Sequence, residues 1–335
     1  MPLCPADAAF SQTLRSALPE RLFKPTEARY LEEPRGRYAG KSGVLVLPEN
    51  TEQVAQVLRI ANAAQVGVVP YGGGTGLVGG QIAPEGPAPV ILSLERMTAI
   101  RAVYPTENVL VAEAGCILAN VQAAAEAEDL LFPLSLASEG SARIGGNLAT
   151  NAGGLNVLRY GNARDLCLGL EAVLPDGEIW HGLSRLRKDN TGYDFRNLLI
   201  GAEGTLGVIT AAALKLAPRP AHSGTALMVV PDPQSALSLL SMARAHLAEG
   251  ISAFELIHRQ GLQFLREKLP DLRQPFVESP KWMVLIDVGL SRGQDPANAL
   301  MRLFEQARTT GLVLAGVIAH SESQRSDFWA VRERI

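Results

Sequence analysis

The chain lacks the sequence features of a membrane protein, of a nucleic-acid-binding protein and of an exported protein. No apolar run reaches the roughly 18 residues that span a bilayer. A formal net charge of −3 gives no attraction to nucleic acid or anionic lipid. The N-terminus lacks the basic and apolar regions of a signal peptide. We therefore expect a cytoplasmic protein with no transmembrane segment and no nucleic-acid partner.

Metal-ligating residues are also few. The three cysteines stand far apart, without C-x-x-C spacing, which is the pattern of a reduced protein. The five histidines show no paired ligand spacing, and each by itself is typical of a surface or hydrogen-bonded core residue (His181, His222, His246, His258 and His320). The sequence predicts no metal ligand in this chain, and no residue stands out as a general base.

Apolar residues make up 47% of the 335 residues, which is enough for two domains with separate cores. Short apolar runs predict strands at 44–47, 66–69, 90–94, 108–112, 170–174, 178–180 and 208–216. Helices are predicted after Asn50, which forms a capping box with Gln53, and near 118–128. Pro175-Asp176-Gly177 predicts a hairpin turn. The Pro-rich stretch 218–220 predicts a domain boundary.

Beyond residue 220 the pattern becomes more regular. Strands at 225–230, 252–257, 282–288 and 312–318 are predicted to alternate with helices near 233–248, 260–269 and 296–310. This order favours an α+β domain whose antiparallel sheet is covered by helices. Residues 326–335 begin an amphipathic helix that nothing terminates, with Phe328, Val331 and Ile335 on one face that needs burial. We infer that the chain is truncated inside this domain, or that a partner completes it.

Glycine is abundant, with 32 residues, and much of it is clustered. In Pro70–Gly80, six glycines allow positive φ angles and let backbone N–H groups converge on an anion such as pyrophosphate. Residues 74–79 match G-x-G-x-x-G, but the Pro-rich residues that follow cannot form the helix which a Rossmann site requires. No Lys-Ser/Thr pair follows, so a Walker A loop is excluded, and a bare turn would need only two glycines. Ser138–Gly154 and Ile200–Thr210 are likewise rich in glycine and other small residues. Three such segments in one domain predict a long ligand that is surrounded by backbone.

Together with Leu158-Arg159-Tyr160-Gly161, these segments form four ordered motifs. They resemble the FAD-binding domain of the vanillyl-alcohol oxidase / p-cresol methylhydroxylase superfamily over about residues 40–219. The likeness is strongest to the bacterial FAD-linked D-2-hydroxyacid dehydrogenases, the D-lactate and D-2-hydroxyglutarate group. It implies an α+β fold, with a two-subdomain PCMH-type FAD-binding domain (40–219), a helical lead-in (1–39) and an incomplete ferredoxin-like α+β cap domain (220–335).

The resemblance also implies where FAD would bind. The loop Tyr71–Leu77 would hold the pyrophosphate, and the other two segments would line the rest of the cofactor. The implied FAD-binding residues are Tyr71, Gly72, Gly73, Gly74, Thr75, Gly76, Leu77, Pro133, Gly140, Ser141, Gly145, Gly146, Asn147, Thr150, Asn151, Gly153, Gly154, Glu203, Gly204 and Ile209. Relatives that tether flavin through this loop place a histidine in it, and this loop has none, so we expect non-covalent FAD.

For the substrate, the W-x-x-R-E pattern of the family maps onto Trp329 to Glu333, so Arg332 would meet the substrate carboxylate. The alternative is a surface arginine paired with a glutamate. The resemblance implies oxidation of a D-2-hydroxyacid to the 2-oxoacid by hydride transfer to flavin N5, with electrons passed on to a quinone, an electron-transferring flavoprotein or a cytochrome. A divalent metal would be bound only in a longer form of the chain. Another flavoprotein reductase or oxidase, or a catalytically incomplete FAD-binding protein, stays open.

Overall fold

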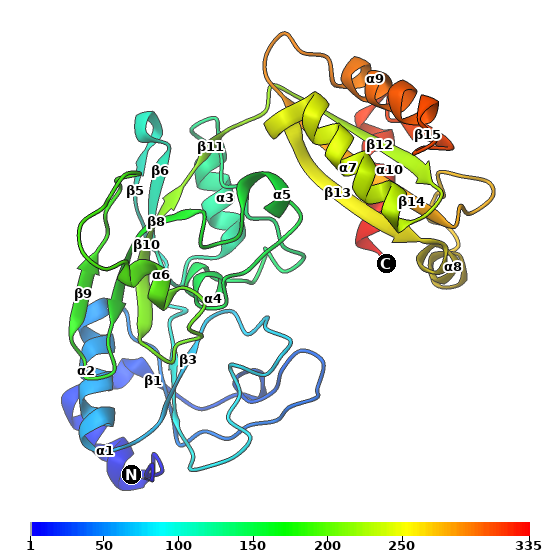
Figure 1. Cartoon of the computed structure of the whole chain (residues 1–335). Coiled ribbons are helices and arrows are strands. Elements are labelled where there is room, and N and C mark those ends of the chain that lie inside the picture. The colour runs from blue at the N-terminus through cyan, green and yellow to red at the C-terminus, as the bar shows by residue number, and fades with distance from the viewer. Residues whose placement is uncertain (1) are drawn as a thin grey trace. The chain divides into compact units, whose positions relative to one another are not determined.

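The computed structural model describes residues 2–335, which form two compact units (Figure 1). The first contains the chain up to Gly153 and Asn162–Pro218, and the second contains Gly154–Gly161 and Arg219–Ile335. The chain thus enters the second unit briefly, returns to the first, and leaves it again at the Pro-rich stretch. The three-part division expected from the sequence stays a prediction.

The first unit begins with a small sheet ordered β1-β2-β4-β3. Strands β2 (Val44–Val46), β4 (Val90–Ser93) and β3 (Val68–Tyr71) are parallel, and β1 (Phe23–Lys24) is antiparallel to β2. Thus the N-terminal lead-in contains a strand besides helix α1 (Ala8–Ala17) and two 3-10 turns, Glu20–Leu22 and Ala28–Tyr30. Helix α2 (Thr51–Ala63) connects β2 to β3, and its predicted cap is confirmed because Asn50 accepts a hydrogen bond from the Gln53 N–H at 3.0 Å.

A second sheet of the same unit is antiparallel, with the order β5-β6-β10-β8-β9. Its strands are β5 (Ile100–Tyr104), β6 (Val109–Glu113), β8 (Cys167–Val173), β9 (Ile179–Gly182) and β10 (Val208–Lys215). The predicted β8–β9 hairpin is confirmed. The accompanying elements are α3 (Leu118–Glu126), α4 (Ile144–Ala149), α6 (Phe195–Leu199), a 3-10 turn (Pro105–Glu107), and the short pair β7 (Leu130–Leu131) and β11 (Ala217–Pro218). The sequence pattern predicted neither β5 nor α4 nor α6.

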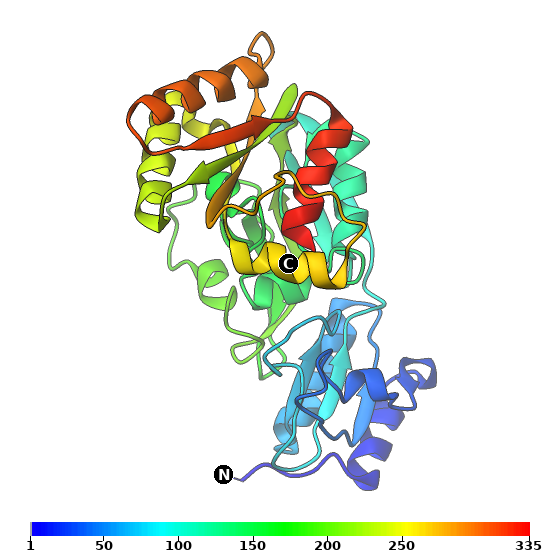
Figure 2. The same cartoon turned by 90° about the vertical axis from the view of Figure 1, so that its right-hand side faces the viewer.

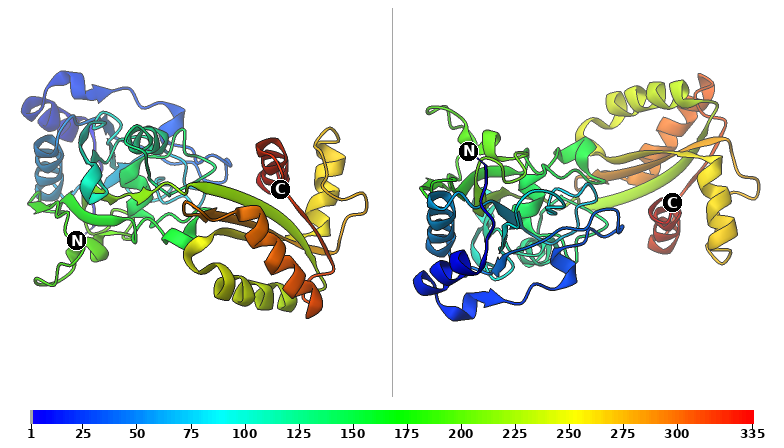
Figure 3. Two further views of the ribbon diagram at one scale, coloured as in Figure 1. Left: turned by 90° about the horizontal axis from the view of Figure 1, so that it is seen from above. Right: turned by 90° about the horizontal axis from the view of Figure 1, so that it is seen from below.

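The second unit is a four-stranded antiparallel sheet between two pairs of helices (Figure 2, Figure 3). Its order is β13-β14-β12-β15, from β12 (His222–Val230), β13 (Ile251–His258), β14 (Trp282–Leu290) and β15 (Ala315–Ile318). Helices α7 (Pro233–Leu247) and α9 (Pro296–Thr309) cover one face, while α8 (Arg259–Lys268) and α10 (Glu322–Glu333) cover the other. A 3-10 turn, Ala248–Gly250, precedes β13. The predicted helix-covered antiparallel sheet is confirmed.

The short helix α5 (Val157–Tyr160) belongs to this second unit although it precedes it in sequence. Its Arg159 donates hydrogen bonds to the Ser252 hydroxyl at 3.2 Å and to the Gly289 carbonyl at 2.8 Å. These bonds attach α5 to β13 and β14.

The C-terminal helix α10 differs from its sequence-based description. It begins four residues earlier than predicted, because Ser321 caps it by accepting from the Gln324 N–H, and it ends at Glu333. Phe328 and Val331 are buried against α8 and the sheet, so the chain itself provides the burial that these two residues need. That the chain is truncated in this domain, or completed by a partner, stays a prediction. Ile335 is 55% exposed and lies beyond the helix.

Among residues 2–335, no helix is long and apolar enough to cross a bilayer. The cysteines of this part of the chain are free thiols: Cys4 is exposed, and Cys116 and Cys167 are buried.

Candidate functional site

A cavity of about 270 Å³ lies in the first unit, where β3 ends. Its wall comes from the loop after β3, from α4 with the turn before it, and from the segment leading into β10. These are the three glycine-rich segments that the sequence singled out. The predicted site residues that line the cavity are Tyr71, Gly72, Gly73, Gly74, Thr75, Gly76, Gly145, Gly146, Asn147, Thr150, Glu203, Gly204 and Ile209.

The loop after β3 lies directly on the second segment. A Cβ atom on Gly73 would lie 2.3 Å from the carbonyl oxygen of Ser141 and 3.1 Å from the Cα of Ala142. Both neighbours are backbone atoms, so no side-chain rotation could make room. Glycine at this position is therefore what lets the two segments touch.

The side chain of Tyr71 holds the start of the loop in place through a hydrogen bond and a ring contact. Its hydroxyl donates to the Arg29 carbonyl at 2.6 Å, and its ring packs on Tyr30 with centroids 4.9 Å apart. The same hydroxyl lies where a Cβ of Gly74 would be, at 2.1 Å, and Gly74 has φ +69. On the cavity side, Gln81 donates from Nε2 to the Gly76 carbonyl at 2.9 Å. These two hydrogen bonds thus fix the loop before any ligand binds.

Asn147 offers a bonding group to a ligand. It is 6% exposed, lines the cavity, and its Oδ1 is buried without a hydrogen-bond partner in residues 2–335. A buried polar atom of this kind is costly unless something bonds to it. Thr150, by contrast, already donates to the Gly146 carbonyl within its own helix at 2.9 Å. A tightly apposed glycine loop with an unpaired amide beside it fits a ligand with phosphates and ring N–H groups, as FAD has.

Seven predicted FAD-binding residues do not line this cavity: Leu77, Pro133, Gly140, Ser141, Asn151, Gly153 and Gly154. Leu77 is partly exposed and Pro133 is buried. Asn151 uses its side chain within the fold, because its Oδ1 accepts from the Arg164 N–H at 3.0 Å. Ser141 contributes its carbonyl to the contact with Gly73. Their role in binding FAD stays a prediction.

Sequence reasoning passed over several residues of the wall, notably Arg143, Gln81 and Ser138. Gln81 directly follows the last loop glycine and begins the Pro-rich stretch that cannot form a helix. Arg143 directly precedes Ile144-Gly145-Gly146. A lone charged residue inside a run of small ones is a signal that was available.

Arg332 lies on α10 in the second unit and pairs with Glu255 of β13, whose Oε2 accepts from its Nε at 2.5 Å. A pairing with a glutamate, the alternative expected from the sequence, is therefore present, and the glutamate lies on strand β13. Nη1 and Nη2 of Arg332 have no hydrogen-bond partner within residues 2–335. The guanidinium therefore keeps two nitrogens available for a carboxylate.

Helix α10 is attached to the sheet by a buried carboxylate. Asp287 on β14 accepts hydrogen bonds from the Thr225 hydroxyl at 2.5 Å, from Arg325 Nε at 3.2 Å and from Trp329 Nε1 at 3.2 Å. Burial opposes the charge of Arg325, but Asp287 outweighs it and raises the pKa of Arg325 above its ordinary value. Through Arg325 and Trp329, this network sets the position of the helix that carries Arg332.

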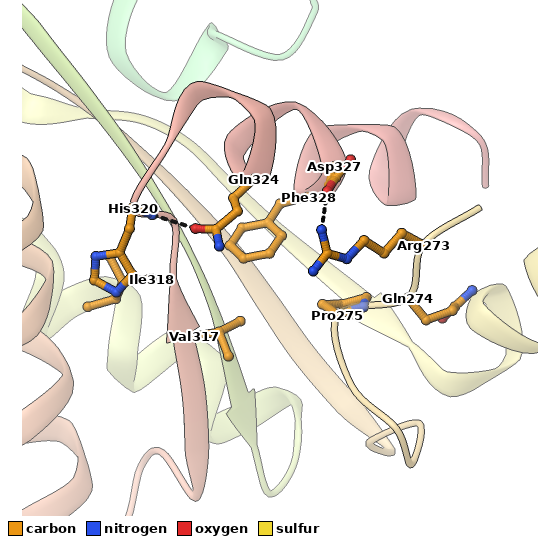
Figure 4. A pocket seen from close by; sticks show the side chains of 9 residues that line it. All are labelled: Arg273, Gln274, Pro275, Val317, Ile318, His320, Gln324, Asp327 and Phe328. Carbon is orange, nitrogen blue, oxygen red and sulfur yellow. Dashed lines mark hydrogen bonds and ion pairs between the residues drawn. The ribbon is translucent and has the colours of Figure 1, made fainter. Parts of the chain in front are cut away.

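A second cavity, of about 330 Å³, lies in the second unit beside α10 (Figure 4). Val317, Ile318 and Phe328 contribute apolar surface to it. Two of its polar contacts are formed within the chain: Arg273 pairs with Asp327 at 3.3 Å, and the His320 backbone N–H donates to Gln324 Oε1 at 2.8 Å. Gln274 also lines this cavity, and its Oε1 and Nε2 are buried without a hydrogen-bond partner in residues 2–335. In the part of the chain that the structure describes, no three His, Cys, Asp or Glu side chains come together as a metal site.

Comparisons with known proteins agree with this geometry. Residues 43–182 match the model of an FAD binding domain, and residues 219–335 match the C-terminal domain of the FAD linked oxidases. The chain is 40% identical to the mitochondrial D-2-hydroxyglutarate dehydrogenase of Rattus norvegicus over 296 residues, which is 88% of this chain and 55% of that one. The chain thus spans about half the length of that relative.

Two solved structures have the same fold. An alkyldihydroxyacetonephosphate synthase matches with a TM-score of 0.77 and 19% identity, over 100% of this chain and 64% of that chain. A p-cresol methylhydroxylase matches with a TM-score of 0.73 and 15% identity, over 96% of this chain and 67% of that chain. The PCMH-type fold expected from the glycine motifs is confirmed, and the FAD binding domain gives FAD as the cofactor.

Proposed function

The chain belongs to the FAD linked oxidases, and from that premise we propose that it oxidises a D-2-hydroxyacid, such as D-2-hydroxyglutarate or D-lactate, to the 2-oxoacid. FAD, when bound, supplies the hydride acceptance that no amino-acid side chain offers. The observation that supports the proposal best is the cavity walled by all three glycine-rich segments, in a chain 40% identical to a D-2-hydroxyglutarate dehydrogenase.

In the first unit, the loop Tyr71–Gly76 would hold the cofactor pyrophosphate through backbone N–H groups. The hydrogen bonds of Tyr71 and Gln81 keep the loop in place. Asn147 would give its unpaired amide oxygen to a ligand N–H or O–H group. These residues bind and orient the cofactor, and none of them needs to change its protonation state.

In the second unit, Arg332 would bind the substrate carboxylate. Glu255 holds Nε and so orients the guanidinium, while Nη1 and Nη2 offer the parallel pair of donors that a carboxylate accepts. Glu255 also partly neutralises the arginine, which favours a substrate that makes two bonds over one that makes a single contact.

The cofactor part of the proposal is tested by purification and acid precipitation. The protein should be yellow, and all of its flavin should appear in the supernatant as FAD. Flavin retained in the pellet would contradict non-covalent binding, and FMN in the supernatant would contradict the choice of cofactor.

The reaction is tested with a dye acceptor in the absence of NAD(P)H. D-2-Hydroxyglutarate and D-lactate should reduce the dye through the flavin, and their L-enantiomers should not. If the hydroxyacids fail and only added NADPH reduces the bound flavin, the protein is a reductase and the hydroxyacid proposal is wrong.

The role of Arg332 is tested by Arg332→Leu, with a matched control at the exposed C-cap residue of the same helix, Arg334→Leu. Loss of two charge-assisted hydrogen bonds should raise KM for the hydroxyacid roughly 10- to 100-fold while FAD content stays unchanged. Equal KM values for the two variants would contradict the assignment.

For the physiological acceptor we propose a quinone, an electron-transferring flavoprotein or a cytochrome. Replacing the dye by each in turn identifies it. The cytoplasmic location stays a prediction, since the rat relative is named as a mitochondrial protein, and cell fractionation with an antibody to this chain tests it.

A further inference from the structure

Arg143 is the one cationic side chain among the residues that line the cavity of the first unit, as far as residues 2–335 show. Glu203 is the one anionic side chain in the same wall. The glycine loop contributes no charge of its own. A ligand with two phosphate groups would therefore meet a single full positive charge here.

The backbone of Arg143 is fixed on both sides. Arg143 forms a β-bridge with Ile117, and the Ile144 N–H that follows donates to the Cys116 carbonyl at 3.0 Å. One nitrogen of the side chain is also fixed: Nη1 donates hydrogen bonds to the carbonyl of Gly115 and, at 3.4 Å, to the carbonyl of Glu95. The guanidinium is thus placed before a ligand arrives.

The rest of the guanidinium is available. Nε and Nη2 have no hydrogen-bond partner among residues 2–335. Neither atom is among the buried atoms that lack a partner, so both are accessible, and Arg143 lines the cavity. Arg143 forms no ion pair in the same part of the chain, and the Glu95 carboxylate is occupied by Arg29 and Tyr30. Arg143 is close enough to Glu95 to help lower the pKa of that carboxyl, but it forms no ion pair with it. A half-buried guanidinium that forms no ion pair fits an anionic ligand.

The phosphate-binding loop is close by. Ser141 and Ala142, the two residues before Arg143, are those that touch Gly73. We propose that Arg143 binds the pyrophosphate of FAD through Nε and Nη2 and adds charge to the N–H groups of the glycine loop. This rests on FAD being the cofactor, and it makes Arg143 a residue that favours the dinucleotide over riboflavin.

The test uses full-length protein stripped of flavin, titrated with FAD, ADP and riboflavin. Three variants are compared with the natural chain: Arg143→Met, Arg143→Lys, and the control Arg196→Met. Like Arg143, Arg196 donates from Nη1 to two backbone carbonyls, those of Cys167 and Leu168 at 3.1 Å, but it does not line this cavity. Unlike Arg143, it also forms an ion pair with Asp194, at 2.9 Å. Circular dichroism and Tm show whether each variant is folded.

We expect Arg143→Met to lower the affinity for FAD and for ADP by a similar factor of about 10 to 100, and to leave the affinity for riboflavin unchanged. Arg143→Lys should recover part of the ADP affinity, since it keeps the charge without the bidentate geometry. The dependence of FAD affinity on salt should become shallower in Arg143→Met and stay as in the natural chain in Arg196→Met.

Unchanged ADP affinity in a folded Arg143→Met protein would overturn the proposal. If the reduction potential of bound FAD shifts at the same time, the guanidinium acts on the isoalloxazine ring instead. Failure of the natural chain itself to bind FAD would refute the assigned cofactor, which is a different outcome from a failure of Arg143 alone.

Discussion

Replacing Gly73 by alanine tests whether contact between two backbone segments sets the phosphate loop. The added Cβ would lie 2.3 Å from the Ser141 carbonyl oxygen, whereas a comfortable C···O contact is about 3.3 Å. The loop must therefore retreat by about 1 Å, because its neighbour is backbone and cannot rotate away.

A shift of that size lengthens an N–H···O contact to phosphate from about 2.9 Å to about 3.9 Å, which no longer counts as a hydrogen bond. If two such bonds are lost, at about 1.5–3 kcal/mol each, FAD affinity falls by about 3–6 kcal/mol, or roughly 10²- to 10⁴-fold. The overpacking itself should lower the free energy of unfolding by only about 1–3 kcal/mol.

The assay is flavin content after purification, followed by titration of the stripped protein with FAD. Gly67→Ala, just before the same strand, is the matched control, because its Cβ would meet two side chains at ordinary contact distances, Leu3 at 3.4 Å and Pro89 at 3.9 Å. Gly67→Ala should bind FAD normally. A folded Gly73→Ala protein that binds FAD within threefold of the natural chain would refute the reasoning.

Three other outcomes follow from burial and charge. Burial raises the pKa of the two buried thiols to about 11 and about 12, so only Cys4 should react with a thiol reagent at pH 8, and a second rapid thiol in native protein would contradict this. Burial opposes the charge of Glu171, but hydrogen bonds led by the one from Arg101 outweigh it and hold its pKa below the ordinary value. That stabilisation is present above about pH 4.5 and is lost as pH falls through the lower native pKa, so Glu171→Gln should flatten the acid side of a stability–pH curve, and an unchanged slope would count against it. Arg325→Met leaves the buried carboxylate of Asp287 without its cation and should cost about 3–5 kcal/mol in the second unit, measured by denaturant unfolding, and a cost below 1 kcal/mol would contradict the network.

The sequence predicted most strands and helices because their apolar periodicity is strong, and it predicted the cap at Asn50 and the turn at Gly177 because those residues act locally. It missed α4, since a helix containing Gly145 and Gly146 has low intrinsic propensity and is held by its surroundings. For α10 the sequence showed an apolar face that needs burial, but not that α8 and the sheet bury Phe328 and Val331, because periodicity does not show what packs on a face.

For the site, the glycine segments were predictable since each carries its own signal in consecutive residues. Arg143 stands out in the sequence only as a charged residue in a run of small ones, and its contacts were not predictable, because the carbonyls that hold it belong to residues 28 and 48 positions earlier in the chain. Nor was Glu255, which lies 77 positions before Arg332. Contacts over such separations depend on the fold, and one sequence does not contain them.

The brief entry of Gly154–Gly161 into the second unit has a consequence for synthesis on the ribosome. The ribosome must add 93 more residues after Arg159 before Ser252 exists, and 130 before the Gly289 carbonyl does. At roughly 5–20 residues per second, that is a wait of about 5 to 25 seconds. During that time the nascent first unit holds α5 as a loop without its partners, so translation speed in this stretch sets how long the loop is open to proteases and chaperones.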